Sequence, residues 1–211
     1  MRWAGTTELT ALLKIEDPHA YRDRLTMPKF MINSAGDQYF LPDASQFYFA
    51  ALVGEKYLRY VPNTDHSLKG SDAPESAFAF YEAIVAGRPR PKFSWSFEPD
   101  GSIEVKAETR PIAATLWQAE NPIARDFRME AIVPVYHRVA LEERGDGVYI
   151  AKPPKPVQGW VAYFIELTFP SGGPYPFKFT TGVRVTPEVL PFGPPPELLG
   201  RGREPRRAGN N

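Results

Sequence analysis

Hydrophobic and polar residues change their spacing along the chain near residue 89. Before it, segments of helical spacing alternate with short apolar runs, which is typical of a parallel sheet with helical crossovers. We expect strands at 29–33 and 57–61. Helices are expected at 43–52, where Asp43 would be the N-cap, and at 74–85. The second of these helices places the following apolar residues on one side: Ala77, Phe78, Tyr81 and Ile84.

After residue 89 the apolar residues repeat with a period of two. Phe93, Trp95 and Phe97 alternate with polar residues, and Asp100-Gly101 provides a turn before the next alternating run, which predicts a hairpin. About seven short strands in roughly 100 residues favour a β-sandwich of the immunoglobulin or fibronectin kind. The remaining strands are expected at 113–118, 129–136, 147–150, 160–169 and 177–185.

The distribution of proline supports the same division, because residues 1–88 contain 5 of the 23 prolines. We therefore expect an α/β part at 1–88, an all-β sandwich at 89–190 and a tail at 191–211. The tail is rich in proline and polar residues, so we expect it to be disordered. Binding of nucleic acid by its four arginines is the weaker alternative.

Composition excludes several classes of function. The 211 residues include 25 basic and 25 acidic side chains, so no summed field draws the molecule to nucleic acid or to an anionic membrane. No apolar run approaches the roughly 18 residues of a membrane span, and the first residues lack the apolar core of a signal peptide. There is no cysteine, and the three histidines are widely spread, so we expect neither a metal nor another cofactor.

One acid and one histidine each follow an expected strand. Asp37 comes after the strand at 29–33, and His66 comes after the strand at 57–61. Loops beyond the carboxyl ends of neighbouring parallel strands converge, so these side chains are candidates for a contact. A carboxylate that accepts the Nδ1 proton of an imidazole leaves Nε2 free to take a proton from a serine. Asp43 and Asp65 compete as the acid, and a Gly-Asp turn beside an exposed histidine without a role is the simpler alternative.

Several stretches carry a resemblance to a known family. They include Gly36-Asp37-Gln38-Tyr39-Phe40-Leu41-Pro42-Asp43 and the run from Leu58 to Leu68, which contains Pro62-Asn63-Thr64-Asp65-His66. Leu116-Trp117-Gln118-Ala119 and Arg125-Asp126-Phe127-Arg128 match in the second region. The chain thereby resembles the PhoPQ-activated pathogenicity-related protein family, which is placed among the α/β-hydrolases. The resemblance implies that residues 1–88 hold the C-terminal strands and helices of a hydrolase sheet, with Asp37 as triad acid and His66 as triad base.

The nucleophile is the point of departure from that family, whose serine lies on an elbow well upstream of the acid. No Gly-x-Ser-x-Gly occurs here, Ser34 is the first serine, and Ser67 and Ser71 follow the base. We therefore expect the C-terminal portion of a serine hydrolase, inactive alone, whose full-length parent cleaves a peptide or ester. The resemblance also implies export to the periplasm or the extracellular space. The alternative is a non-catalytic module that binds a protein or a glycan or takes part in signalling.

The sequence also predicts how several side chains pack. Side chains that would face missing strands should be exposed to water; these are Phe30, Ile32, Leu58 and Tyr60. Asp126 should pair with its flanking arginines where the two regions meet. The aromatic residues of the second region, Trp95, Trp117 and Trp160 among them, are expected in the core rather than on a carbohydrate-binding surface.

Overall fold

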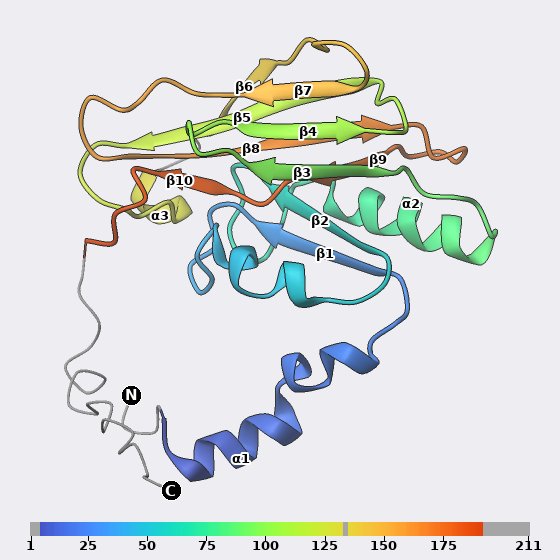
Figure 1. The fold of residues 1–211 in the computed structure, drawn as a ribbon, viewed down its shortest axis with the longest axis horizontal. Coiled ribbons are helices and arrows are strands. Elements are labelled where there is room, and N and C mark those ends of the chain that lie inside the picture. The colour runs from blue at the N-terminus through green and yellow to red at the C-terminus, as the bar shows by residue number, and fades with distance from the viewer. Residues whose placement is uncertain (1–4, 133–134, 192–211) are drawn as a thin grey trace, which may run out of the picture.

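The computed structural model describes residues 5–132 and 135–191 (Figure 1). The expected tail therefore lies, apart from its first residue, outside the described residues. Within the described ranges the chain is a mixed α/β structure, with most of its strands in two sheets and few helices. This agrees with the expected fold class at that level.

The two sheets pack against each other and enclose an apolar core (Figure 1). The smaller sheet contains β3 (Phe93–Phe97), β4 (Ile103–Ala107) and β7 (Val148–Ala151), in that order. In the larger sheet, the strands follow the order β1 (Lys29–Ser34), β2 (Lys56–Val61), β9 (Phe177–Thr180), β8 (Trp160–Phe169), β5 (Ala113–Asn121) and β6 (His137–Ala140), with β10 (Arg184–Thr186) beside β8.

The two regions of the chain share the larger sheet. β1 and β2 are parallel, as their apolar runs predicted, and Phe30 lies opposite Tyr57 in this pair. β2 then pairs antiparallel with β9, where Leu58 lies opposite Thr180. The proposed boundary at residue 89 accordingly separates a parallel pair from antiparallel strands within one continuous sheet.

Two expected elements are wrong. Residues 43–52 form two short 3₁₀ helices, η2 (Ala44–Phe47) and η3 (Phe49–Ala51), instead of one α-helix. The side chain of Asp43 makes no capping bond, because it is paired with Arg125 instead. The expected strand at 129–136 begins as a short helix, α3 (Met129–Ile132), in which the N–H groups of Ala131 and Ile132 donate to the carbonyl of Arg128.

The expected helix at 74–85 is present as α2 (Ala73–Val85), but it packs through the other side. Phe80 is buried, and the centroid of its ring lies 5.1 Å from the ring centroid of Phe30 on β1. Ala79 and Ala83 are also buried, since their small side chains let the helix approach the sheet closely. The side on which the sequence pattern grouped apolar residues is exposed to solvent, and its members are Ala77, Phe78, Tyr81 and Ile84.

Leu58 and Tyr60 correct a second expectation, because their side chains are only 1% and 2% exposed. They lie in a core cluster with Phe164 of β8 and Tyr136, both supplied by the second region. Phe30 and Ile32 are partly buried. Strands of the second region therefore bury side chains that were expected to be exposed to water.

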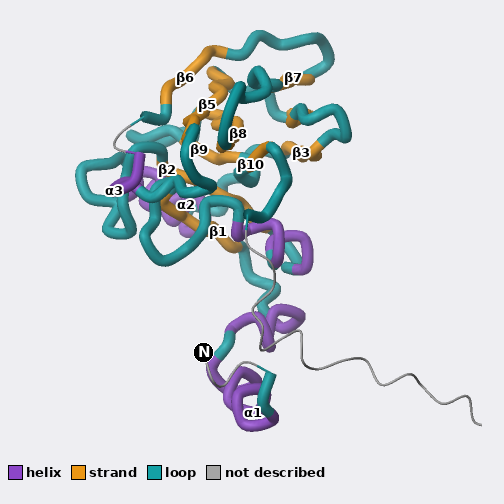
Figure 2. The backbone as a smooth tube through the Cα atoms, turned by 90° about the vertical axis from the view of Figure 1, so that its left-hand side faces the viewer, coloured by secondary structure: helices purple, strands orange, loops and turns teal. Residues whose placement is uncertain are grey.

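The first helices extend away from both sheets (Figures 1 and 2). Neither α1 (Thr7–Glu16) nor η1 (Pro18–Arg24) contains a buried residue, and Leu12, Leu13 and Ile15 are exposed. No helix in the described part of the chain is long and apolar enough to cross a membrane. The three tryptophans Trp95, Trp117 and Trp160 are partly buried against the core clusters, as the alternation of their strands predicted.

Candidate acid–base site

Asp37 lies in the loop that follows β1 and is almost fully buried. Its Oδ1 accepts hydrogen bonds from the backbone N–H groups of Tyr39, at 2.7 Å, and Phe40, at 3.1 Å. Burial acts to raise the pKa of Asp37, but the hydrogen bonds from Tyr39, His66 and Phe40 together outweigh burial. The pKa of the Asp37 carboxyl therefore lies below its ordinary value, and the side chain is held as a carboxylate.

His66 lies in the loop that follows β2, and the structure brings it to Asp37. Its Nδ1 is 2.8 Å from Oδ2 of Asp37, a distance for a strong hydrogen bond. The imidazole is 51% exposed, and the rings of Tyr39 and Phe40 flank it at centroid distances of 5.0 and 5.9 Å. The backbone N–H of His66 donates to Oε1 of Gln38 at 3.0 Å. The two loops are thus bonded through both the side chain and the backbone of His66.

The two competing acids lie elsewhere. Asp65 accepts hydrogen bonds from the backbone N–H and the hydroxyl of Ser67, which is a local turn. Asp43 is paired with Arg125 at 2.5 Å, and both side chains are more than nine-tenths buried. Among the three candidates, only Asp37 has its carboxylate bonded to the histidine.

The serines near the site have other partners. The buried hydroxyl of Ser34 donates to the carbonyl of Thr64 at 2.6 Å and accepts from the N–H of Gly36 at 3.0 Å. Ser67 donates to Asp65, and Ser71 donates to the carbonyl of Leu68 at 2.7 Å. Each of these hydroxyls stabilises a loop, and none is hydrogen-bonded to His66 within the described ranges.

The second region contacts both loops of the site. The N–H of Met129 donates to the carbonyl of Gly36 at 2.9 Å. A Cβ at Gly36 would lie 2.6 Å from the carbonyl oxygen of Thr64 and 2.6 Å from Cγ of Met129, so only glycine allows this approach. In the other loop, Asn63 is hydrogen-bonded to the main chain of Tyr136. The second region is therefore bonded to both loops that carry the acid–base pair.

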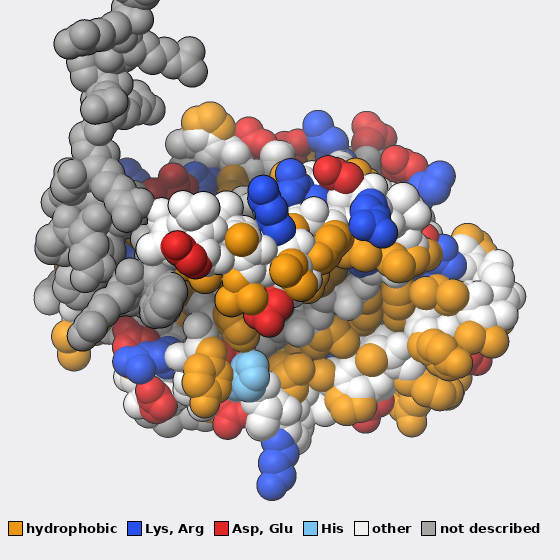
Figure 3. Space-filling model, turned by 90° about the horizontal axis from the view of Figure 1, so that it is seen from below, with side chains coloured by type: hydrophobic (Ala, Val, Ile, Leu, Met, Phe, Trp, Pro, Cys, Tyr) orange, Lys and Arg blue, Asp and Glu red, His pale blue; other side chains and the backbone are white. Residues whose placement is uncertain are grey.

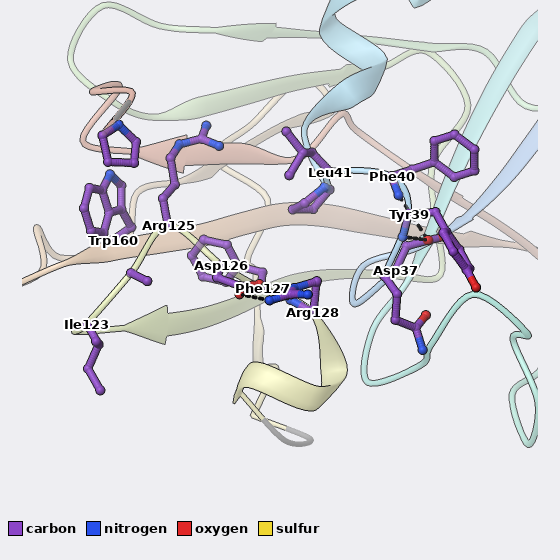
Figure 4. A pocket seen from close by; sticks show the side chains of 14 residues that line it. Asp37, Tyr39, Phe40, Leu41, Ile123, Arg125, Asp126, Phe127, Arg128 and Trp160 are labelled. Atoms are coloured by element: carbon purple, nitrogen blue, oxygen red, sulfur yellow. Dashed lines mark hydrogen bonds and ion pairs between the residues drawn. The ribbon is translucent and has the colours of Figure 1, made fainter. Parts of the chain in front are cut away.

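A cavity of about 410 Å³ lies beside Asp37, between its loop and the segment from Ile123 to Arg128 (Figure 4). Figure 4 shows Trp160 and Ile123 toward one end, and Tyr39 and Phe40 toward the other. Its two arginines are both paired with carboxylates. Arg128 binds Asp126 at 2.6 Å, as expected for this run, whereas Arg125 binds Asp43 instead of Asp126. The cavity wall is mainly apolar, and neither of its arginines is without a carboxylate partner.

The sequence did not predict a role in this site for three residues. These are Gln38, Asn63 and Arg125, the last as the partner of Asp43. Asn63 carries a detectable signal, because asparagine tolerates the left-handed backbone needed for a sharp turn after a strand. Its φ is 54°. Across residues 5–132 and 135–191, no group of three or more His, Cys, Asp or Glu side chains is placed to hold a metal ion.

The lowered pKa of Asp37 predicts how the pair responds to acid. We expect the carboxyl to titrate below its ordinary value of 3.8, so the contribution of the pair to stability is complete above that value. It is lost only as the pH falls through the lower, folded-state pKa. Carboxyl ¹³C chemical shifts followed during an acid titration would measure this, with Asp37→Asn identifying the signal. A midpoint at or above 3.8 in the folded protein would contradict the expectation.

Comparisons with known proteins show the family of the chain. The sequence profile of the PhoPQ-activated pathogenicity-related protein family matches residues 1–128, which include both Asp37 and His66. Autocrine proliferation repressor protein A of Dictyostelium discoideum is 32% identical over an alignment that covers 92% of this chain. The chain spans 44% of that relative's length, and no solved structure matches. Since the family match covers more than half of the chain, the chain belongs to the PhoPQ-activated pathogenicity-related protein family.

Proposed function

We propose that Asp37 and His66 are the acid and the base of a serine hydrolase. The observation that carries this proposal is the 2.8 Å contact between His66 Nδ1 and Asp37 Oδ2, made beyond the carboxyl ends of two adjacent parallel strands. Asp37 fixes the proton of the imidazole on Nδ1 and stabilises the imidazolium that forms. Nε2 of His66 is then the atom that takes the proton of a serine hydroxyl and later returns it to the leaving group.

The nucleophile of this proposal comes from a polypeptide segment outside the described residues, because the nearby serine hydroxyls are engaged in their own loops. β1 is the first strand of the larger sheet and is paired on one side with β2. Its other edge is where a further parallel strand would add. Figure 3 shows hydrophobic side chains gathered on the face seen from below. The exposed large hydrophobic side chains of the loop and short helices after β1 include Tyr39, Phe40, Leu41 and Phe47.

The proposed substrate is an uncharged carbonyl compound, a peptide or an ester. The cavity beside Asp37 is lined mainly by apolar side chains, and both of its arginines are neutralised by carboxylates. An anionic substrate group would have to compete with Asp43 or Asp126 for those arginines. A purely binding module is less favoured, since it gives no reason to hold an imidazole against a buried carboxylate.

A fluorophosphonate probe, which reacts with activated serines, tests the proposal in the natural polypeptide that contains this chain. We expect the probe to label a serine other than Ser34, Ser67 or Ser71, and we expect His66→Gln to abolish labelling. His137→Gln is the matched control, because His137 is exposed on β6 and contacts Gln118. Labelling that survives His66→Gln, or labelling of one of the three named serines, would contradict the proposal.

A further inference from the structure

The side chain of Asn63 makes an unusual link between the two regions. Its Nδ2 donates to the carbonyl of Tyr136 at 2.8 Å, and its Oδ1 accepts from the N–H of the same residue at 2.9 Å. The carboxamide thereby satisfies both the N–H and the carbonyl of Tyr136, as the backbone of a neighbouring strand would. Tyr136 is itself buried, with 4% of its surface exposed, so its backbone is a fixed partner.

From Asn63 the loop runs to His66 through a series of bonded residues. The left-handed backbone of Asn63 turns the chain after β2. Thr64 is then fixed twice, by its hydroxyl donating to the carbonyl of Val61 at 2.9 Å and by its carbonyl accepting from Ser34. His66 follows, with its N–H on Gln38. Asp65, between Thr64 and His66, is bonded to the N–H and hydroxyl of Ser67. Because Thr64 and His66 are both fixed by hydrogen bonds, a displacement at Asn63 would be transmitted to the imidazole.

Two residues of the second region, Met129 and Tyr136, also hold the acid loop. Met129, at the start of α3, donates from its N–H to the carbonyl of Gly36, the residue before Asp37. The hydroxyl of Tyr136 donates to the carbonyl of Ala35 at 3.4 Å. Tyr136 is therefore bonded to both loops, to the Asp37 loop through its hydroxyl and to the His66 loop through its backbone.

We propose that Asn63 is a positioning residue through which the second region sets the Asp37–His66 hydrogen bond. Precision matters here, because a hydrogen bond of 2.8 Å is lost if the ring moves by about 1 Å. A positioned base also contributes to catalysis only when it is held near its productive geometry. The inference rests on the proposed function of His66 for its catalytic meaning, although the geometry that it concerns is independent of turnover.

Asn63→Gly is the decisive variant, because glycine adopts the left-handed backbone without strain and the variant loses the carboxamide. The readout is the imidazole ¹⁵N and ¹H NMR spectrum of His66, which reports the ring nitrogen that carries the proton. We expect the strongly deshielded Nδ1 proton signal to be lost and the tautomers to become mixed. Asp146→Gly is the matched control, since Asp146 also has a left-handed backbone, with a φ of 51°, in the exposed loop before β7. It should leave the His66 spectrum unchanged.

The outcomes separate positioning from general stability. If Asn63→Gly lowers the melting temperature but leaves the His66 signals unchanged, Asn63 is merely structural and the proposal is wrong. If that variant does not fold, Asn63→Asp is used instead, because it keeps the acceptor for the N–H of Tyr136 and removes the donor to its carbonyl. Loss of the His66 Nδ1 proton signal in this variant would support the proposal, and an unchanged signal would contradict it. If Asn63→Gly displaces His66 but the unsubstituted protein is not labelled by the fluorophosphonate probe, positioning is upheld and the hydrolase proposal is contradicted.

Discussion

Replacing Phe179 by Ala is expected to lower the free energy of unfolding by about 3–5 kcal/mol, the usual cost of removing a buried phenylalanine ring. Phe179 lies on β9 and is 0% exposed. The centroid of its ring is 4.2 Å from that of Tyr57 and 5.2 Å from that of Phe30, both in the first region. It is 6.1 Å from the ring centroid of Phe93 in the second region. The cavity left by Ala would therefore open where strands of both regions meet.

Chemical denaturation followed by NMR signals from both regions measures this effect. We expect signals of β1 and β2 to disappear at the same denaturant concentration as those of β8, and this shared midpoint to fall in Phe179→Ala. Phe78→Ala is the control, because this side chain is 48% exposed on α2, and a surface change of this kind costs about 0.5 kcal/mol or less. A loss confined to signals of residues 89–190 would show instead that the boundary at residue 89 separates independent domains.

Most strands were predictable because their signals are local. The run from Trp160 to Phe169 is almost continuously apolar and forms β8 over the same residues. The runs ending near Asn33 and Val61 read as buried parallel strands, and their order placed Asp37 and His66 at one edge. The juxtaposition of these two side chains then followed from the geometry of parallel sheets.

The features that sequence reasoning missed depend on distant partners. Asp43 resembles a helix cap locally, but its partner Arg125 is 82 positions away. Asn63 is likewise bonded to Tyr136, 73 positions away. On α2, apolar residues occur on both sides, and only the position of the sheet decides that the side with Ala79 and Ala83 is buried. Local periodicity carries no information on such contacts.

The buried pair of Asp43 and Arg125 is the second place where one substitution should have a large effect. Arg125→Met removes the guanidinium and leaves the carboxylate of Asp43, 7% exposed, without its cation. Breaking a buried ion pair in this way costs about 3–5 kcal/mol, because an uncompensated charge stays away from water. The pair connects the end of the acid loop to the segment before α3, so the cavity beside Asp37 should also become less ordered.

Urea denaturation of three variants distinguishes this cause from a simple loss of packing. Arg128→Met is the matched control, because Arg128 is 46% exposed and its pair with Asp126 should contribute only about 0–1 kcal/mol. The double variant Asp43→Leu/Arg125→Met removes both charges, and replacing a buried pair by apolar residues is often nearly neutral. We therefore expect the double variant to be more stable than Arg125→Met alone. If Arg125→Met and Arg128→Met lose equal stability, the charge of Asp43 is not held away from water as the structure indicates.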